Sequence, residues 1–195
     1  MDQQILIGAT NNAHKVKEIS AMLPSFFVLQ SLRDVGYLDE IIEDGKTLEE
    51  NALIKARTLH HFLNKNVFSE DTGLEVTALG GAPGVHTARY AGEQKNDSDN
   101  IQLLLKNLEG REDRSARFRT IIALIYNHKE YLFEGTVEGQ IADSIMGDGG
   151  FGYDPVFIPN GYAQTFAQLD TGIKNSISHR ANAVSKLVEF LIGNA

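Results

Sequence analysis

The chain has 195 residues, which suits one domain or two small lobes that share a core. Hydrophobic residues make up 42% and charged residues 23%, and these near-average proportions exclude a disordered or low-complexity protein. Lysine plus arginine total 18 against 26 for aspartate plus glutamate, so the formal net charge is −8. A nucleic-acid partner is therefore not expected, because basic surface supplies most of the affinity for a phosphate backbone.

The chain contains no cysteine, which excludes disulfides, thiol catalysis and thiolate metal sites. No segment approaches the ~18 apolar residues that indicate a membrane span. The N-terminus carries an acidic residue early and lacks the basic region of a signal peptide. We expect a soluble, cytoplasmic protein with no membrane partner.

Helical and strand patterns alternate through the first half of the chain. Pro24 ends the first predicted helix, and Thr47 opens a capping box at the start of the second. An acidic turn at 70–73 separates two short apolar runs. The predicted elements are a strand at 5–7, helices at 13–23 and 48–63, and strands at 67–68 and 74–76.

The second half adds a pair of long strands with a break at 127–130 that suits a hairpin. The predicted elements are a helix at 99–108, strands at 116–126, 131–141 and 155–158, and a helix at 178–192. This mixture favours an α/β protein with a mixed central sheet, helices on its faces and a cleft.

The first candidate site lies in the turn between the first strand and helix, where Thr10, Asn12 and Lys15 follow one another at short spacing. A helix N-terminus offers free N–H groups and partial positive charge to an anion, and Lys15 adds a full charge. The alternative is a helix cap beside a solvated lysine. No P-loop motif occurs in the chain.

The second candidate is a set of carboxylates that would need a cation if they gathered. Mg²⁺ accepts a few carboxylates together with substrate phosphate oxygens, and an ionised aspartate beside it could accept a proton from water. Asp71 is the strongest member, whereas Glu50 could simply close the capping box. The members are Glu43, Asp44, Glu49, Glu50, Glu70 and Asp71.

The third candidate is the glycine-rich loop at 147–155. Its spacing matches the dinucleotide fingerprint literally, but that fingerprint must open a helix and Pro155 begins a strand-like run instead. The loop could present Phe151 and Tyr153 to a planar base. The alternative is a loop whose two aromatic rings are tucked into the core.

The fourth candidate places cations at the start of the last helix, where the positive end of the helix dipole disfavours them. Lys174, His179 and Arg180 could donate to an acidic or carbonyl-bearing ligand. A solvated arginine beside a packed histidine is the alternative. Lys55 and Arg89 are further candidates for phosphate contact or plain surface residues. The six histidines predict no metal site: His60 and His61 are adjacent on a helix and point apart, and His128 is isolated.

Seven stretches that run in order along essentially the whole chain carry a resemblance: Thr10–Lys15, Thr47–Ala52, Glu70–Leu74, Leu79–Gly84, Ala88–Tyr90, Gly150–Pro155 and Ile177–Arg180. Together they resemble the Ham1-like inosine triphosphate pyrophosphatase family. The resemblance implies Mg²⁺-dependent hydrolysis of ITP, dITP and XTP to the monophosphate and pyrophosphate. It also implies a homodimer, an elongated mixed sheet, and two lobes with a substrate cleft between them.

The resemblance also implies roles for single residues. Asp71 would be the proton acceptor and a metal ligand, with either Glu43 or Glu50 as a second ligand. This chain has Glu70 at a position where bacterial members of the family commonly have aspartate. The residues implied to bind substrate are Thr10, Asn11, Asn12, Ala13, His14, Lys15, Lys55, Thr72, Phe151, Gly152, Tyr153, Asp154, Lys174, His179 and Arg180.

A donor-lined pocket would explain the choice of base. Hypoxanthine and xanthine carry a carbonyl where adenine carries an amine, and donors left unpaired can cost ~10⁴ in discrimination. Arg180 and loop N–H groups are the predicted donors. The alternatives are a Maf-like nucleotide pyrophosphatase with another base preference and a catalytically silent nucleotide-binding module; a plain interaction protein would need none of these motifs.

Overall fold

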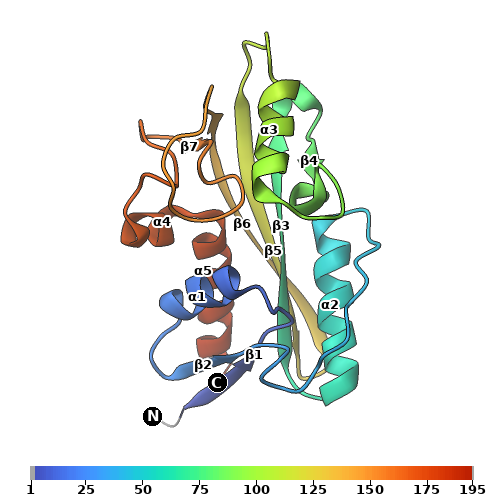
Figure 1. Cartoon of the computed structure of the whole chain (residues 1–195). Helices are drawn as coiled ribbons and strands as arrows, with labels where there is room; N and C mark the ends of the chain where they lie inside the picture. Colours follow the sequence, from blue (N-terminus) through green and yellow to red (C-terminus); the bar gives the residue numbers. More distant parts are fainter. Residues whose placement is uncertain (1–2, 195) are drawn as a thin grey trace. The chain divides into compact units, whose positions relative to one another are not determined.

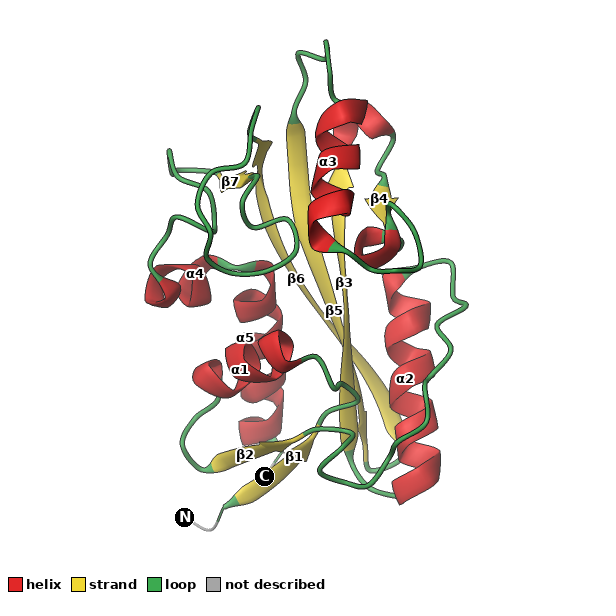
Figure 2. Ribbon diagram, in the orientation of Figure 1, coloured by secondary structure: helices red, strands yellow, loops and turns green. Residues whose placement is uncertain are grey.

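The computed structural model describes residues 3–194 and contains the alternation of helices and strands that the sequence predicts (Figures 1 and 2). In chain order the elements are β1 (Gln4–Ile7), α1 (Ala13–Met22), β2 (Phe27–Gln30), α2 (Leu48–Leu63), β3 (Val67–Val76), a 3-10 helix (Thr77–Leu79), β4 (Pro83–Gly84), a second 3-10 helix (Thr87–Arg89), α3 (Asp97–Asn107), β5 (Ser115–Tyr126), β6 (Lys129–Ile141), β7 (Phe157–Pro159), α4 (Thr171–Ile177) and α5 (His179–Gly193).

Both strand senses occur, so the predicted mixed α/β architecture is confirmed. β1 and β2 form a parallel pair, and five further strands hydrogen-bond in the order β4-β3-β5-β6-β7. The β3–β4 and β6–β7 pairs are antiparallel. Among the described residues, no helix is long and apolar enough to cross a membrane.

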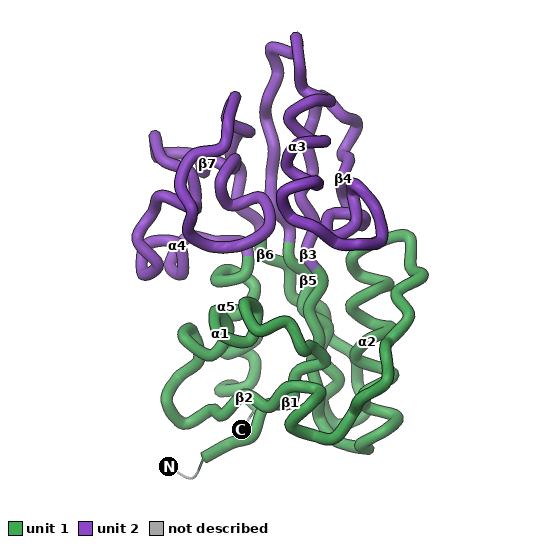
Figure 3. The backbone as a smooth tube through the Cα atoms, in the orientation of Figure 1, with its two compact units in different colours: residues 1–71, 120–135, 180–195 green, residues 72–119, 136–179 purple. Residues whose placement is uncertain are grey.

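The chain divides into two units, coloured separately in Figure 3. Unit 1 holds the chain up to Asp71 together with Thr120–Gly135 and the segment from Arg180 onward; unit 2 holds Thr72–Arg119 and Thr136–His179. The strands β3, β5 and β6 each contribute residues to both units. The single domain over 1–195 and the cleft expected from the sequence stay predictions.

Each unit has its own hydrophobic core. In unit 1, Leu6 of β1 and Phe68 of β3 pack with Ile19 of α1 and Leu187 of α5, all nearly or fully buried. The core of unit 2 consists of aliphatic and aromatic side chains from β3, α3, β5, β6, β7 and the segments on either side of β7; its largest members are Phe118, Tyr153, Phe157 and Phe166. Burial of this apolar surface is the main stabilising contribution in each unit.

The structure differs from the predicted elements in several places. Glu70–Gly73 is not a turn: it lies within the continuous strand β3, which is hydrogen-bonded between β4 and β5. The hairpin turn is only Asn127–His128, with φ of 50° and 61°, the left-handed values of the tight turn that two-residue hairpins prefer. Strand β2 and helix α4 were not predicted.

Candidate functional site

Two consecutive carboxylates in the middle of β3, Glu70 and Asp71, organise the polar side chains of unit 1. Successive residues of a strand point to opposite faces, so the two carboxylates form ion pairs with different cations, although the charge of Lys15 also acts on Asp71. Lys15 and Arg180 pair with Glu70, whereas Lys55 pairs with Asp71. The strand geometry thus separates two neighbouring acids into two environments.

Glu70 is the centre of a buried network with Lys15, Arg180 and Glu18, which we call the Glu70 network. The Lys15 Nζ lies 2.8 Å from Glu70 Oε1, and Arg180 donates from Nε to Glu70 Oε2 at 2.8 Å. Arg180 also donates from Nη1 to Glu18 Oε2 at 2.6 Å. Burial alone would raise the pKa of Glu70, but the charges of Arg180 and Lys15 hold it well below its usual range. Glu70 therefore stays ionised.

Asp71 belongs to a second group with Lys55 and Glu43, which we call the Asp71 cluster. The Lys55 Nζ donates to Asp71 Oδ1 at 3.0 Å and to Glu43 Oε2 at 2.6 Å. Burial raises the pKa of Asp71 above its ordinary value, against the opposing charges of Lys55 and Lys15. A carboxylate whose pKa is raised while it remains near an ammonium group is a better proton acceptor than a free aspartate.

The Asp71 cluster fits a magnesium ion better than the alternative centred on Glu50. Asp71 and Glu43, which both pair with Lys55, supply hard oxygen ligands. In nucleotide enzymes, Mg²⁺ is bound by one or two carboxylates together with substrate phosphates. Glu50 instead closes the start of α2: its Oε2 accepts the Lys46 N–H at 2.5 Å, and its own N–H donates to Thr47 Oγ1. Within residues 3–194, no group of three or more histidine, aspartate or glutamate side chains is placed to hold a metal ion.

The turn before α1 combines a helix cap with a paired lysine. Asn12 Oδ1 accepts the N–H groups of His14 and Lys15, so the capping alternative is confirmed for Asn12. Thr10 Oγ1 accepts the Asn12 N–H, and Asn11 Oδ1 accepts that of Arg33. The alternative of a solvated lysine is wrong, because the Lys15 side chain is 18% exposed and joined to Glu70.

In unit 2, the glycine-rich loop and α4 bring Phe151, Asp154 and Lys174 together. The Lys174 Nζ lies 2.6 Å from Asp154 Oδ2 and 5.2 Å from the centre of the Phe151 ring. Asp154 Oδ2 also accepts the Phe151 N–H at 2.8 Å. Gly150 has a φ of 74°, and a Cβ there would collide with this carboxylate, so the loop requires glycine. These contacts fix the conformation of the loop, and Phe151 is half-buried at its surface.

Tyr153 does not face a ligand, so the prediction that it stacks on a base is wrong. Its ring is buried in the core of unit 2, and its hydroxyl donates to the Thr87 carbonyl at 2.9 Å. Burial raises the pKa of this phenol. Gly152 next to it donates its N–H to Asp97 at 2.8 Å. Phe151 is then the aromatic side chain of this loop that can meet a base.

The residues around the start of α5 are buried, not solvated. His179 stacks on Phe118, with ring centres 4.6 Å apart and an interplanar angle of 14°, which confirms the packed-histidine alternative. Arg180 is 1% exposed, so the alternative of a solvated arginine is wrong.

Thr72 follows Asp71 on β3 and is half-buried. Arg89 forms a long ion pair with Glu93 at 3.9 Å, a surface interaction of little energy.

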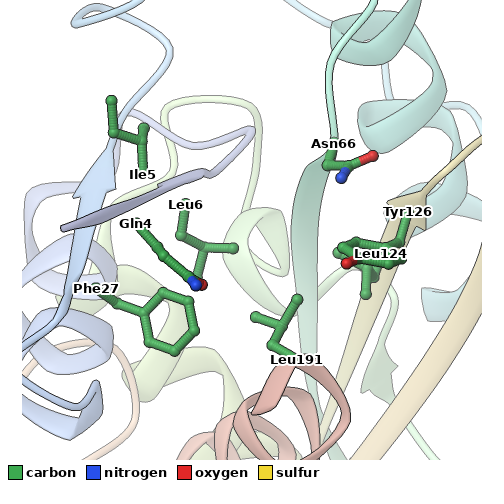
Figure 4. Close-up of a pocket in the computed structure, with 8 residues that line it drawn as sticks. All are labelled: Gln4, Ile5, Leu6, Phe27, Asn66, Leu124, Tyr126 and Leu191. Carbon is green, nitrogen blue, oxygen red and sulfur yellow. The ribbon is translucent and has the colours of Figure 1, made fainter. Parts of the chain in front are cut away.

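A pocket of ≈ 250 Å³ in unit 1 lies apart from these groups (Figure 4). Leu6, Phe27 and Leu191 give it an apolar wall, and Gln4 and Asn66 add amide groups. It has neither a carboxylate nor a cation among its lining residues, so it lacks the charged groups that the predicted chemistry requires.

Comparisons with known proteins show the family of this chain. The sequence model of the Ham1 family matches residues 6–190. This chain belongs to the Ham1 family. Two solved Ham1 proteins have the same fold: that of Staphylococcus aureus is 39% identical with a TM-score of 0.89, and that of Coxiella burnetii is 36% identical with a TM-score of 0.90. Each match covers 98% of this chain and 100% of the other.

Curated relatives in the family carry a functional name. The dITP/XTP pyrophosphatase of Bacillus licheniformis is 52% identical over 190 residues, which cover 95% of this chain and 97% of the relative. The dITP/XTP pyrophosphatase of Christiangramia forsetii is 46% identical over 186 residues, covering 95% and 98% respectively. The similarity therefore extends over nearly the whole length of both chains.

Two partners in these groups escaped the sequence analysis. Glu18 completes the pairing of Arg180, and its position three residues after Lys15 on α1 places both on one helix face, a signal that could have been used. Asp97, in the first turn of α3, accepts the N–H of Gly152, which lies 55 residues further along the chain. Nothing local in the sequence indicates that second contact.

Proposed function

We propose that this Ham1 chain hydrolyses ITP, dITP and XTP to the monophosphate and pyrophosphate, and thereby removes these nucleotides from the pool. The observation that carries the proposal is the Asp71 cluster, in which Lys55 of α2 donates to both Asp71 of β3 and Glu43. The names of the curated relatives support the choice of purine substrate.

Asp71 would accept a proton from the water that attacks the linkage between the α- and β-phosphates. Its raised pKa and its place beside Lys55 suit that step. Lys15 and Lys55 would neutralise phosphate charge, since positioning and charge stabilisation dominate this kind of transfer. Asp71 and Glu43 would hold Mg²⁺, which when bound supplies a Lewis acid for the phosphate oxygens.

The base would be recognised in unit 2. Phe151 offers an aromatic face held by Asp154 and Lys174. The donors would be loop N–H groups other than those of Phe151 and Gly152, which already donate to Asp154 and Asp97. Donors favour the carbonyl of hypoxanthine and xanthine over the amine of adenine. We do not retain Arg180 as a direct donor to the base, because its Nε, Nη1 and Nη2 groups donate to Glu70 and Glu18.

A substrate panel tests the proposal. We expect pyrophosphate release from dITP, ITP and XTP with Mg²⁺, and loss of release when EDTA removes the metal ion. ATP and GTP should be poor substrates. Preference for dCTP or dTTP would instead indicate a Maf-like specificity, and binding of dITP without pyrophosphate release would indicate a silent nucleotide-binding module. Either result would contradict the proposal.

Replacing Phe151 tests the base-stacking role. Stacking of a base on an aromatic ring is worth about 1–3 kcal/mol, so we expect Phe151→Leu to raise KM for dITP by roughly 5- to 150-fold. The melting temperature should change little, because Phe151 is only half-buried. Phe62→Leu is a matched control, since that ring is 54% exposed on α2. An unchanged KM for the Phe151 variant would remove Phe151 from the site.

We also propose a homodimer and a cytoplasmic location, which follow from the family resemblance and the composition. Size-exclusion chromatography with light scattering would determine the number of chains in solution.

A further inference from the structure

Two histidines for which the sequence predicts no metal site meet on the surface of unit 1. His60 lies in the last turn of α2, and His128 is the second residue of the tight turn between β5 and β6. His60 Nε2 and His128 Nδ1 are 3.3 Å apart, and the two ring planes are inclined at 71°. Residues 68 positions apart in the chain therefore present two imidazole nitrogens to each other.

The hydrogen bonds define the tautomers of the neutral pair. His60 Nδ1 lies 2.6 Å from the Lys65 carbonyl oxygen, which can only accept, so Nδ1 carries the proton. His60 Nε2 is then a lone-pair nitrogen, and it accepts the Nδ1–H of His128. A carbonyl that fixes the proton on one ring nitrogen, and so frees the other as a ligand, is the usual arrangement behind a metal-binding histidine.

We propose that His60 Nε2 and His128 Nδ1 form a binding site for one divalent transition-metal ion of the zinc, nickel and copper class. Two nitrogens that each lie about 2.0–2.1 Å from a tetrahedral zinc ion are about 3.3–3.4 Å apart. The observed separation of 3.3 Å matches this value without movement of the backbone. The two nitrogens point at each other in the hydrogen-bonded pair, so binding requires both rings to turn until their lone pairs converge on the ion, with the His128 proton moving from Nδ1 to Nε2.

The backbone that carries the two rings is fixed by independent contacts. Arg57 on α2 donates from Nε and Nη2 to the two carboxylate oxygens of Glu130, at 2.7 and 2.8 Å. Asn66 Oδ1 accepts the N–H of Asn127, the other residue of the turn, at 2.8 Å. The hairpin is thus attached to the end of α2 on both sides of the histidine pair. A metal ion would meet a preorganised pair and would spend little of its binding energy on ordering it.

The choice of ion follows from the donors. Imidazole nitrogens suit zinc, nickel and copper, whereas Mg²⁺ takes oxygen ligands and would remain at the carboxylates. The C-terminal end of α2, where His60 lies, also carries the partial negative charge that favours a cation. In the described part of the chain no third protein ligand joins such a group, so water would complete the coordination.

Titration calorimetry of the full chain with Zn²⁺, in buffer with excess Mg²⁺, tests the proposal. We expect one saturable Zn²⁺ per chain, with binding at least about tenfold weaker in both His60→Gln and His128→Gln, since even indirect partners of a metal ligand contribute that much. His61→Gln is the matched control, because His61 is exposed on the same helix and should bind Zn²⁺ as the unmodified chain does.

Thermal unfolding gives a second readout that does not depend on enzymatic activity. Zn²⁺ should raise the melting temperature of the unmodified chain and of His61→Gln, but not of the two pair variants. Absence of saturable binding would overturn the proposal. Binding that persists in both pair variants, or that is lost in His61→Gln, would also overturn it by assigning the ion to other groups.

Discussion

Asp71→Asn is expected to leave the fold intact and to lower kcat for dITP by about 10²- to 10⁴-fold, the usual contribution of a positioned general base. An amide has nearly the same shape as the carboxylate but cannot accept the proton, and it is a poor ligand for Mg²⁺. The fold should persist because Lys55 keeps its second partner, Glu43, at 2.6 Å. Pyrophosphate release at saturating dITP measures the effect.

The control for this variant is Asp39→Asn, which makes the same chemical change at an exposed position of unit 1. We expect its kcat and KM to equal those of the unmodified chain. Circular dichroism of both variants separates a catalytic defect from unfolding. A folded Asp71→Asn enzyme with nearly unchanged kcat would show that another group accepts the proton, and the assignment of the Asp71 cluster as the reaction centre would be wrong.

The sequence predicted best those elements whose ends carry local chemical signals. Helix α2 begins one residue after Thr47, whose hydroxyl accepts the Glu50 N–H, and this cap was visible in the sequence. Helix α1 likewise ends before Pro24. Strand β3 was misread as two strands and a turn, because Glu70 and Asp71 resemble turn residues until distant cations neutralise them. Local patterns cannot reveal partners that arrive from α1, α2 and α5.

The same limit explains which of the candidate site residues could be expected to lie together. Asp71 and Lys55 were expected to serve phosphate chemistry, and the structure joins them at 3.0 Å. For Arg180, the sequence showed only a cation at an unfavourable helix end, which suggested a ligand. The structure instead provides two buried carboxylates, one of them 110 residues away on β3. Pairings over such separations follow from tertiary contacts, so spacing along the chain could not distinguish a ligand from a partner.

Glu70→Gln is expected to destabilise the protein by about 3–5 kcal/mol, the usual cost of removing one partner from a buried ion pair. The Glu70 network contains two cations, Lys15 and Arg180, and two carboxylates. Replacing Glu70 by the neutral amide leaves one positive charge in excess around a site where Glu70 is 2% exposed. Urea unfolding followed by circular dichroism gives the change in the free energy of unfolding.

Glu130→Gln is the matched control, because Glu130 pairs with Arg57 in a similar geometry but its side chain is 40% exposed. Solvent screens that pair, so its loss should cost about 1 kcal/mol or less. Glu70→Asp keeps the charge on a shorter side chain and should fall between the two. Equal losses for Glu70→Gln and Glu130→Gln would mean that burial adds nothing to the network. If Arg180 and Lys15 hold β3 in place for Asp71, their charges depend on Glu70 for compensation. Glu70→Gln must then lower the free energy of unfolding more than Glu130→Gln does.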